Sequence, residues 1–542
     1  MHSRQGAQVL MGVFASILVA GAAGAASLTR GPYLQSVTPT SATVAFRLDT
    51  ACPAQVRYGE GGNLSSTAGS GSTARQHGIH LTGLRPGTEY SYEVVGCGVP
   101  MGRAGRLRTA PAPQSREVRF GVLGDFGTGS SDQMDVARSI QARRPELIVS
   151  VGDNIYDSGT DAEFESNFLR PMGSLLAEVP LFASLGNHEY VTNQGQPYLD
   201  NFYLPSNNPK GTERYYSFDW GNVHFVALDS SCLLEITSAD RCTVVEQLDW
   251  LEKDLATSKA QWKIAYFHYP LWSSGKYGSV TSLRKRLAPI LEAGGVDLVF
   301  TGHEHDYERT RPMKGDAEAA PGDEGITYLV VGSGGASLRP FTRAQPKWSV
   351  IRDAENNGFL EVTVQRERLT AQMVTPSGQV IDSFSLTQPV SSDAALELNA
   401  QAEPARGVAP LEVLLAATVD PPDAQVSWRL ADGRVLAGTQ VRERFATPGE
   451  HSVEVEARRG EQVATQSLVV TVSPSGGPDE EESPTTPPPS ERPGTEPSVP
   501  ARPEQPFSPD DSAGCNVGGS SLLLGALGGL GVLLRGRTRR RR

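Results

Sequence analysis

The sequence has no excess of basic residues, and it contains few long apolar runs. Its 542 residues include 49 lysines and arginines against 61 aspartates and glutamates, so the formal net charge is −12. Because binding to nucleic-acid phosphates needs basic stripes, this balance argues against nucleic acid as a partner. The chain is also too long for a single hydrophobic core, and we expect several folded units.

Cysteine is scarce as well, with five residues in the whole chain. Four of them form two local pairs, Cys52 with Cys97 and Cys232 with Cys242, and we expect each pair to be joined by a disulfide. Cys515 stands alone near the C-terminal end.

One of the two long apolar runs lies at the N-terminus. It covers residues 9–20, follows the basic residue Arg4 and precedes the small residues "GAAGAAS". This order is typical of a secretory signal peptide, so we expect residues 1–26 to be removed and the rest of the chain to be exported. A buried N-terminal helix is the alternative, although nothing in the sequence caps it. Export permits the two disulfides.

The second apolar run lies near the C-terminus, in "CNVGGSSLLLGALGGLGVLLRGRTRRRR". Residues 517–534 carry no charge and are just long enough to span a bilayer, and the arginines that follow would stay on the cytoplasmic side. This segment, residues 515–542, resembles the myxobacterial-type C-terminal sorting tag, which makes Cys515 a candidate for processing or lipid attachment. A plain single-span membrane anchor is the alternative. Both readings predict folded domains that are extracellular or at the cell surface.

Two β-rich stretches flank the centre of the chain. Residues 27–112 contain "LTGLRPGTEYSYEV", which resembles a fibronectin type III domain. Residues 393–473 contain "APLEVLLAA" and "TPGEHSVEVEA", which resemble a PKD-type, immunoglobulin-like module. We expect both to be all-β sandwiches without a catalytic cluster, the second serving spacing or adhesion. Residues 474–514 are rich in Pro, Glu, Ser and Thr and are expected to be a disordered stalk.

The central region, residues 116–388, has a different pattern in which apolar runs alternate with longer helical or loop segments. This pattern predicts a layered α/β domain with β-sheets flanked by helices. Five of the runs end in metal-binding residue types, in "GVLGDFG", "SVGDNIY", "SLGNHE", "AYFHYP" and "FTGHEH". Ligand sites in layered α/β folds lie beyond the carboxyl ends of strands. We therefore expect one site formed by Asp125, Asp153, Tyr156, Asn187, His188, His268, His303 and His305.

Each of these motifs, taken alone, also has a structural explanation. A "GD" after a strand is usually a turn, Asn187 could cap a helix, and a lone histidine such as His268 is more often a core or surface residue. The pair in "GHEH" is harder to explain in this way, because alternate residues of an extended segment point in the same direction. His224, in the middle of a strand-like run, is predicted to be structural.

The order GDxG, GDxxY, GNH[E/D], an isolated His and GHxH resembles the purple acid phosphatases, within the calcineurin-like metallophosphoesterases. The resemblance includes the N-terminal sandwich but not the PKD-like module, the stalk or the tail. It implies two metal ions that share Asp153. Iron(III) would take the counterparts of Asp125, Asp153, Tyr156 and His305. A divalent Fe, Zn or Mn ion would take those of Asp153, Asn187, His268 and His303. The oxygen-rich set with a phenolate suits a hard trivalent ion.

The resemblance also implies roles for residues around the metals. Broader metallophosphoesterases have a histidine where this sequence has Gly127, and Tyr156 supplies the missing ligand. His188 resembles the family histidine that contacts the phosphate or helps to protonate the leaving group. Many members carry a further histidine shortly after the counterpart of His268, where this sequence has Tyr277. Glu308 and Arg309 are expected to form a salt-bridged corner.

The predicted function is that of an exported or surface-anchored acid phosphatase. It would hydrolyse small-molecule or protein phosphomonoesters through a metal-bound hydroxide. A phosphodiesterase or nucleotide-cleaving metallophosphoesterase is one alternative, and a non-catalytic surface adhesion protein is another. The membrane would be reached through the C-terminal segment.

Overall fold

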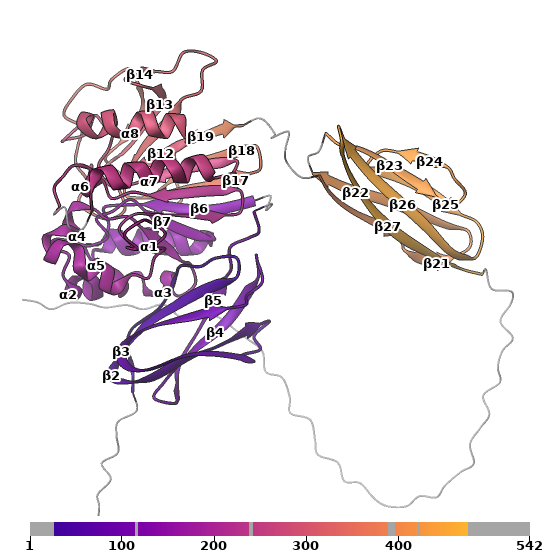
Figure 1. Cartoon of the computed structure of the whole chain (residues 1–542), viewed down its shortest axis with the longest axis horizontal. Helices are drawn as coiled ribbons and strands as arrows, with labels where there is room; N and C mark the ends of the chain where they lie inside the picture. The colour runs from indigo at the N-terminus through magenta and orange to yellow at the C-terminus, as the bar shows by residue number, and fades with distance from the viewer. Residues whose placement is uncertain (1–25, 114–116, 238–241, 389–395, 421–422, 475–542) are drawn as a thin grey trace, which may run out of the picture. The chain divides into compact units, whose positions relative to one another are not determined.

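The computed structural model describes residues 26–113, 117–237, 242–388, 396–420 and 423–474, which are coloured by residue number in Figure 1. The predicted signal peptide, the stalk and the tag with Cys515 thus lie almost entirely outside the described residues. Within the described ranges, no helix is long and apolar enough to cross a membrane.

The N-terminal part is a five-stranded antiparallel sheet built around the 20-residue strand β2. The first half of β2 pairs with β1 and the second half with β4, while β3 pairs with both halves. A disulfide joins Cys52 of β2 to Cys97, as predicted. The strands are β1 (Leu28–Gln35), β2 (Ser41–Glu60), β3 (Ser66–Thr82), β4 (Glu89–Gly96) and β5 (Val99–Arg108).

The central part contains two sheets. The first has six strands in the order β19-β18-β17-β6-β7-β8, of which β6, β7 and β8 are parallel to one another. Its strands are β6 (Glu117–Leu123), β7 (Leu147–Ser150), β8 (Leu181–Ala183), β17 (Phe359–Gln365), β18 (Arg368–Val374) and β19 (Val380–Thr387).

The second sheet has eight strands in the order β14-β13-β15-β12-β11-β10-β9, with β16 paired to β13. β10, β11, β12 and β15 are parallel. Its strands are β9 (Tyr216–Trp220), β10 (Val223–Ala227), β11 (Trp262–Tyr266), β12 (Leu298–Thr301), β13 (Tyr307–Lys314), β14 (Ala317–Glu318), β15 (Ile326–Val331) and β16 (Ser349–Asp353).

Aromatic side chains pack the two central sheets face to face. The ring of Phe120 in β6 lies edge-on to Phe225 in β10, with centroids 5.1 Å apart. Phe182 in β8 stacks on Phe218 in β9 at 3.9 Å. Alternate residues of a strand point to opposite faces, so each sheet keeps a second face for helices.

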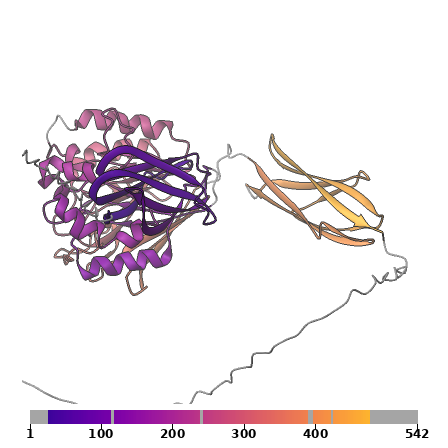
Figure 2. The ribbon, with the colours of Figure 1, turned by 90° about the horizontal axis from the view of Figure 1, so that it is seen from below.

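Helices cover these second faces, and Figure 2 shows them on two sides of the central domain. Leucines of α7 and α8 join Val226 and Ala265 of the eight-stranded sheet in a separate apolar cluster. Ile140 of α1 lies beside Gly121 on the six-stranded sheet. The helices are α1 (Ser131–Arg143), α2 (Asp161–Glu163), α3 (Gly173–Leu176), α4 (Asn187–Val191), α5 (Gln196–Asn201), α6 (Ser230–Leu233), α7 (Val244–Thr257) and α8 (Thr281–Ala293), with a π-helix η1 (Phe164–Leu169) and a 3₁₀-helix η2 (Asn193–Gly195). The predicted layered α/β core is therefore confirmed.

The C-terminal part consists of a three-stranded and a five-stranded sheet, with orders β20-β22-β25 and β21-β27-β26-β23-β24. Side chains of both sheets meet in one apolar cluster around the buried Trp428. The strands are β20 (Glu397–Glu403), β21 (Arg406–Val408), β22 (Leu411–Asp420), β23 (Gln425–Leu430), β24 (Val435–Ala437), β25 (Gln440–Phe445), β26 (Gly449–Arg459) and β27 (Gln462–Ser473). Many short strands are compatible with the predicted immunoglobulin-like unit, and that assignment stays a prediction.

Candidate metal centre

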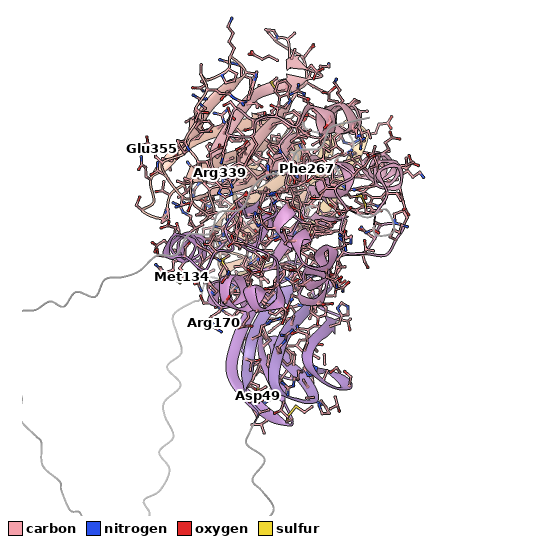
Figure 3. The ribbon with its side chains drawn as sticks, turned by 90° about the vertical axis from the view of Figure 1, so that its left-hand side faces the viewer. Asp49, Met134, Arg170, Phe267, Arg339 and Glu355 are labelled. Atoms are coloured by element: carbon pink, nitrogen blue, oxygen red, sulfur yellow. A yellow bond between two sulfur atoms is a disulfide. The ribbon has the colours of Figure 1, made fainter. Side chains whose placement is uncertain are left out.

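Each candidate ligand follows the carboxyl end of a parallel strand. Three of these strands belong to the six-stranded central sheet and two to the eight-stranded sheet. Asp125 follows β6, Asp153 and Tyr156 follow β7, and Asn187 follows β8. From the second sheet, His268 follows β11, and the segment after β12 carries His303 and His305. Figure 3 labels Phe267, the residue before His268, in the middle of the domain.

Four of these side chains meet at the Tyr156 hydroxyl. This hydroxyl lies 3.1 Å from Asp125 Oδ1, 3.1 Å from Asp153 Oδ2 and 3.2 Å from His305 Nε2. His305 Nε2 is also 3.5 Å from Asp125 Oδ1. The oxygen-rich half of the predicted ligand set is therefore assembled in one place.

The other half is centred on Asn187. Its Oδ1 lies 3.1 Å from His268 Nε2 and 3.0 Å from His303 Nδ1. His268 Nε2 is 3.3 Å from Asp153 Oδ2, so Asp153 contacts both halves. The structure thus brings together all seven residues that the sequence proposes as ligands, and their role as ligands remains a prediction.

The backbone at the candidate ligands is strained. Asp125, Asp153 and His303 have φ values of 54°, 48° and 71°, in the left-handed region that non-glycine residues rarely adopt. The His303 N–H donates to both carboxylate oxygens of Asp125, at 3.2 and 3.0 Å, and so helps to hold this geometry. Such strain costs of the order of 1–3 kcal/mol per residue and is concentrated at functional sites.

Gly127 has no room for a side chain. A Cβ at this position would lie 1.7 Å from the carbonyl oxygen of Asn154. The backbone of the segment that leads to Tyr156 thus fills the space that a histidine side chain would need. This close approach explains why the phenol of Tyr156, and not a residue at position 127, reaches Asp125.

Two of the histidines present the Nε2 atom to the cluster. His268 Nδ1 lies 3.0 Å from the carbonyl of Val151, and His305 Nδ1 lies 2.8 Å from the carbonyl of Ser337. When Nδ1–H donates to a carbonyl, the lone pair is on Nε2, which is the usual arrangement for an imidazole that ligates a metal.

Burial dominates the electrostatics of the cluster. It raises the pKa of Asp125, and the Asp153 charge adds to the effect. It lowers the pKa of His303 to about 3 and that of His305 to about 4. For His268 burial acts in the same direction, but the charge and hydrogen bond of Asp153 outweigh it and raise the pKa to about 9. Conversely, His268 holds the pKa of Asp153 below its usual range, although burial opposes this.

The donor set fits a pair of cations. Asp125, Asp153 and His268 are buried and offer ligand atoms that all lie within 4.8 Å of one another. Buried carboxylates normally need a charged partner or a metal. A phenol and carboxylates on one side suit a hard ion, and imidazoles with an amide on the other suit a borderline divalent ion.

His188 lies beside the cluster. Its Nε2 is 3.9 Å from Asp153 Oδ2, and its ring centroid is 4.4 Å from that of Tyr156. Its Nδ1 lies 2.5 Å from the carbonyl of Asp157. The side chain is 27% exposed, so part of the ring faces solvent next to the candidate ligands.

Glu189, for which no role was predicted, organises the loops of the site. Its buried carboxylate accepts hydrogen bonds from the N–H groups of Asp153 at 3.2 Å, Asn154 at 2.7 Å and Gly186 at 2.6 Å. Burial and the Asp153 charge raise its pKa to about 7. The signal was present in "GNHE", where a glutamate at the third helical position is typical of a capping box.

Arg339 had no signal in the sequence. Its guanidinium donates to the carbonyl of His303 at 2.8 Å and lies 5.2 Å from the ring centre of Tyr277. The Tyr277 ring is 5.1 Å from that of His303, and this tyrosine is 55% exposed. Arg339, labelled in Figure 3, and Tyr277 therefore form an aromatic and cationic rim beside the candidate ligands.

Three other predicted residues lie outside the cluster. His224 sits between Asp219 at 2.7 Å and Asp254 at 2.9 Å, in agreement with a structural role. Arg309 pairs with Asp382 at 2.6 Å, as a salt-bridged corner requires. Glu308 does not take part in that ion pair, because its carboxylate accepts two hydrogen bonds from Ser274, both at 2.6 Å.

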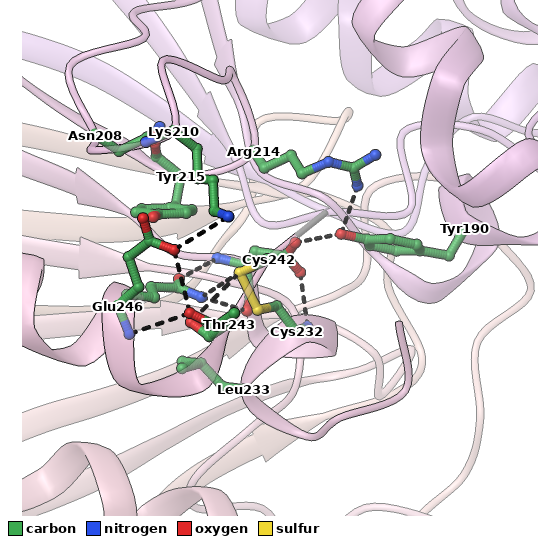
Figure 4. The surroundings of a disulfide bond; sticks show 12 residues. Tyr190, Asn208, Lys210, Arg214, Tyr215, Cys232, Leu233, Cys242, Thr243 and Glu246 are labelled. Atoms are coloured by element: carbon green, nitrogen blue, oxygen red, sulfur yellow. Dashed lines mark hydrogen bonds and ion pairs between the residues drawn. A yellow bond between two sulfur atoms is a disulfide. The ribbon is translucent and has the colours of Figure 1, made fainter. Parts of the chain in front are cut away.

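The second predicted disulfide, between Cys232 and Cys242, is present and is shown in Figure 4. Asp229 lies beside it and accepts a hydrogen bond from the Cys232 N–H at 3.0 Å. Although these three residues are close enough to hold a metal, the disulfide consumes both thiols, so the group is structural.

Comparison with known protein families gives matches over the N-terminal part and the central domain. Residues 118–307 match the calcineurin-like phosphoesterase family, and residues 325–383 match the C-terminal domain of iron/zinc purple acid phosphatase-like proteins. Residues 25–100 match a domain family of unknown function. The fibronectin, PKD and sorting-tag resemblances stay predictions.

Two plant proteins illustrate the similarity. Purple acid phosphatase 15 of Arabidopsis thaliana is 31% identical over 297 residues, which cover 48% of this chain and 53% of that protein. Probable inactive purple acid phosphatase 1 of the same plant is 28% identical over 400 residues, 64% of this chain and 62% of that protein. This chain therefore spans less than two thirds of either relative, and similarity alone does not separate active from inactive members.

Among solved structures, purple acid phosphatase PPD1 from yellow lupin (Lupinus luteus) seeds matches with a TM-score of 0.58 and 21% identity. The match covers 68% of this chain and 78% of that chain, and it shows a shared fold. Together the matches support a phosphoesterase hydrolase. The central domain of this chain is therefore similar to calcineurin-like phosphoesterase domains of the purple acid phosphatase type.

Proposed function

We propose that this chain is an exported acid phosphatase that hydrolyses phosphate monoesters at a two-metal site. The observation that carries the proposal is the convergence of seven potential ligands from two sheets, with Asp153 in contact with both halves. The matches to purple acid phosphatases support the same reaction class.

The ligand assignment follows the chemistry of the donors. Iron(III) would be held by Asp125, Asp153, Tyr156 and His305. A divalent Fe, Zn or Mn ion would be held by Asp153, Asn187, His268 and His303. When bound, such a pair supplies positive charge to phosphate oxygens and lowers the pKa of a water nucleophile.

His188 would act on the substrate from beside the ligands. Donation of Nδ1–H to the carbonyl of Asp157 leaves Nε2 free to exchange a proton. The partly exposed ring can reach a phosphate group or the oxygen of a leaving alcohol. Glu189 would be a positioning residue, because it fixes the backbone on both sides of Asp153 without facing the substrate.

Two alternatives remain open to test. A phosphodiesterase would use the same metals but accept an ester group on both sides of the phosphate. A surface adhesion protein would use the β-rich units and keep the central domain only as a scaffold. The buried carboxylates and strained ligand backbone are difficult to explain in a scaffold, and we therefore favour the enzyme.

The deciding experiment uses the purified full chain. We expect an iron–phenolate absorption band in the visible region and hydrolysis of an aryl phosphate in acid to neutral medium. Asp153→Asn should lower the rate by at least about 100-fold. Asp382→Asn is the matched control, since Asp382 is also buried but pairs with Arg309 outside the site.

Each alternative has a distinct result. A colourless, iron-free preparation that cleaves only diesters would overturn the monoesterase assignment. An Asp153→Asn variant with an unchanged phenotype together with an unchanged phosphatase rate would favour the adhesion protein.

Export and surface attachment form a separate part of the proposal. Two disulfides in the described residues support an oxidising, extracellular location. Intact-mass analysis of surface-released protein checks the role of Cys515. Loss of the terminal arginines is expected, and their retention would contradict processing at this cysteine.

A further inference from the structure

The loop that carries Tyr277 to the candidate centre is held from below by two buried acids. Glu304 accepts hydrogen bonds from the N–H groups of Tyr277 and of the residue that follows it, at 2.5 and 2.6 Å. Glu308 accepts two from Ser274, through its N–H and its hydroxyl. Residues 274–278 therefore form a built surface beside the candidate ligands, and what lies on that surface bears on the substrate.

Positively charged side chains surround Tyr277 on this surface. The guanidinium carbon of Arg339 lies 5.2 Å from the centre of the tyrosine ring, and Lys276 Nζ also lies 5.2 Å from it. Arg343 contacts the next residue of the loop, since a Cβ on Gly278 would lie 3.1 Å from Arg343 Nη1. Three cations from two separate segments thus gather around one exposed aromatic ring.

The acids of the protein do not neutralise these three cations. Within the described ranges, no carboxylate forms an ion pair with Lys276, Arg339 or Arg343. The two segments that carry them, residues 269–283 and 333–352, contain no acidic residue, although the net charge of the chain is −12. Like charges that lie close together repel each other, so an anion bound among them would be held by all three.

The cations lie close enough to the candidate centre to act on a bound substrate. The ring of Tyr277 is 5.1 Å from that of His303, so Lys276 and Arg339 are within about 10 Å of this proposed ligand, one Debye length at 0.1 M salt. On the other side of the cluster, the exposed acid Asp157 lies beside His188. A second negative charge on a substrate is therefore attracted towards Tyr277 and repelled near His188.

We propose that Lys276, Arg339 and Arg343 form a subsite for a second negative charge on the leaving group. The inference rests on the proposed phosphatase activity and names its substrate class. The preferred substrates are phosphate monoesters whose alcohol carries another anionic group, such as a carboxylate or a second phosphate. Arginine binds such groups through paired N–H donors and lysine binds them as a point charge.

The test uses the full chain and two substrates of the same shape. 4-Carboxyphenyl phosphate carries a negative charge on its ring, and 4-carbamoylphenyl phosphate has a neutral amide in the same place. The value of kcat/KM is measured for each at about pH 6, where a carboxylate is charged. The ratio of the two values, charged over neutral, cancels effects common to both substrates, such as metal loading. In the wild type this ratio should fall several-fold when the ionic strength rises from about 0.05 to 0.5 M.

Substitution of the cations should lower the same ratio. Lys276→Gln and Arg339→Gln should each reduce it by about 3-fold and the double variant by about 10-fold, mainly through a higher KM for the charged substrate. The ratio of the double variant should no longer respond to salt. Because Arg339 also donates to the carbonyl of His303, its loss can affect folding. Lys276 and Arg343 are exposed, so Lys276→Gln and Arg343→Gln test the subsite independently.

The matched control is Lys314→Gln, which removes one positive charge at the far end of β13. The eight residues of this strand place Lys314 about 20 Å from the end that lies next to the candidate centre. The ratio should stay at the wild-type value in this variant. A ratio that is unchanged in every rim variant, or lowered equally by Lys314→Gln, would overturn the subsite while hydrolysis of both substrates upholds the phosphatase. If the wild type hydrolyses neither substrate, the proposed function is wrong and the subsite is refuted with it.

Discussion

Replacing Tyr156 by phenylalanine tests the metal centre at a single atom. The change removes only the hydroxyl that lies 3.1 Å from both Asp125 and Asp153. The ring keeps its packing against His188 and His305. Any effect can therefore be assigned to the oxygen and not to lost volume.

The expected magnitude differs between the metal-free and the loaded protein. Without metals the hydroxyl has one proton and donates to one of two carboxylates, so its loss should lower the free energy of unfolding by about 1–3 kcal/mol. In the loaded protein the same change would remove the proposed iron ligand. We expect loss of the visible band, lower iron content and a phosphatase rate reduced by at least about 100-fold.

The assay compares Tyr156→Phe with Tyr190→Phe in absorption spectra, metal analysis and hydrolysis of an aryl phosphate. Tyr190 is the matched control because its hydroxyl is also buried, between Asp229 and Arg214, and also donates to a carboxylate. Both variants should lose similar stability, but only Tyr156→Phe should lose its colour. A Tyr156→Phe protein with the wild-type band and iron content would refute the assignment of the phenol as a ligand.

Three further changes test other parts of the site and the fold. Glu189→Gln should lower the phosphatase rate by about 10–100-fold while both metals remain bound, because an amide accepts hydrogen bonds from the loop N–H groups less well than a carboxylate does. A wild-type rate would contradict a positioning role for Glu189. Tyr277→Ala should reduce kcat/KM for an aryl phosphate by about 5-fold and leave kcat/KM for glycerol phosphate unchanged, since only an aromatic leaving group can pack on the tyrosine ring. Equal losses of kcat/KM on both substrates would contradict this. The carboxylates of Asp219 and Asp254 outweigh burial and raise the pKa of His224 to about 9, above its value near 6.5 in the unfolded chain. The contribution of the charged His224 to the free energy of unfolding is therefore full below pH 6.5 and is lost as the pH rises through 9. Solvent screens the interaction with Asp219, which is 65% exposed, so we expect His224→Gln to lower the free energy of unfolding by about 2 kcal/mol at pH 6 and by little above pH 9.5. Urea unfolding at several pH values measures this, and a loss that does not depend on pH would contradict the linkage.

The layered core could be predicted because its parallel strands are buried on both faces and read as short apolar runs. The order of the strands within each sheet could not be predicted from the sequence. β17 lies beside β6, with Val362 opposite Phe120, although the two segments are far apart in the sequence. Nothing local in "FLEVTVQ" specifies that neighbour, because the pairing is decided by how the whole sheet closes.

The candidate ligands were predictable for a physical reason. Each follows a parallel strand, and the carboxyl ends of parallel strands lie at the same edge of a sheet. Arg339 was missed because its loop after β15 carries no motif and its contact with His303 is tertiary. No role was predicted for Glu304 in "GHEH", since the sequence does not reveal that its carboxylate accepts N–H groups from the loop around Tyr277.

Asp125 and Asp153 each lower the stability of the metal-free fold in two ways, through backbone strain and through a buried carboxylate, and this favours the enzyme over the adhesion protein. Asp125 and Asp153 hold left-handed backbone, which glycine or asparagine would adopt more cheaply, and they also bury carboxylates beside each other. A scaffold would be more stable with asparagine at both positions, because the amide relieves the repulsion and suits the backbone. When a pair of cations is bound, the protein with aspartates is the more stable one, since only carboxylates supply the negative charge that holds the cations. The metal-free protein should therefore gain stability from Asp125→Asn, and the loaded protein should lose it.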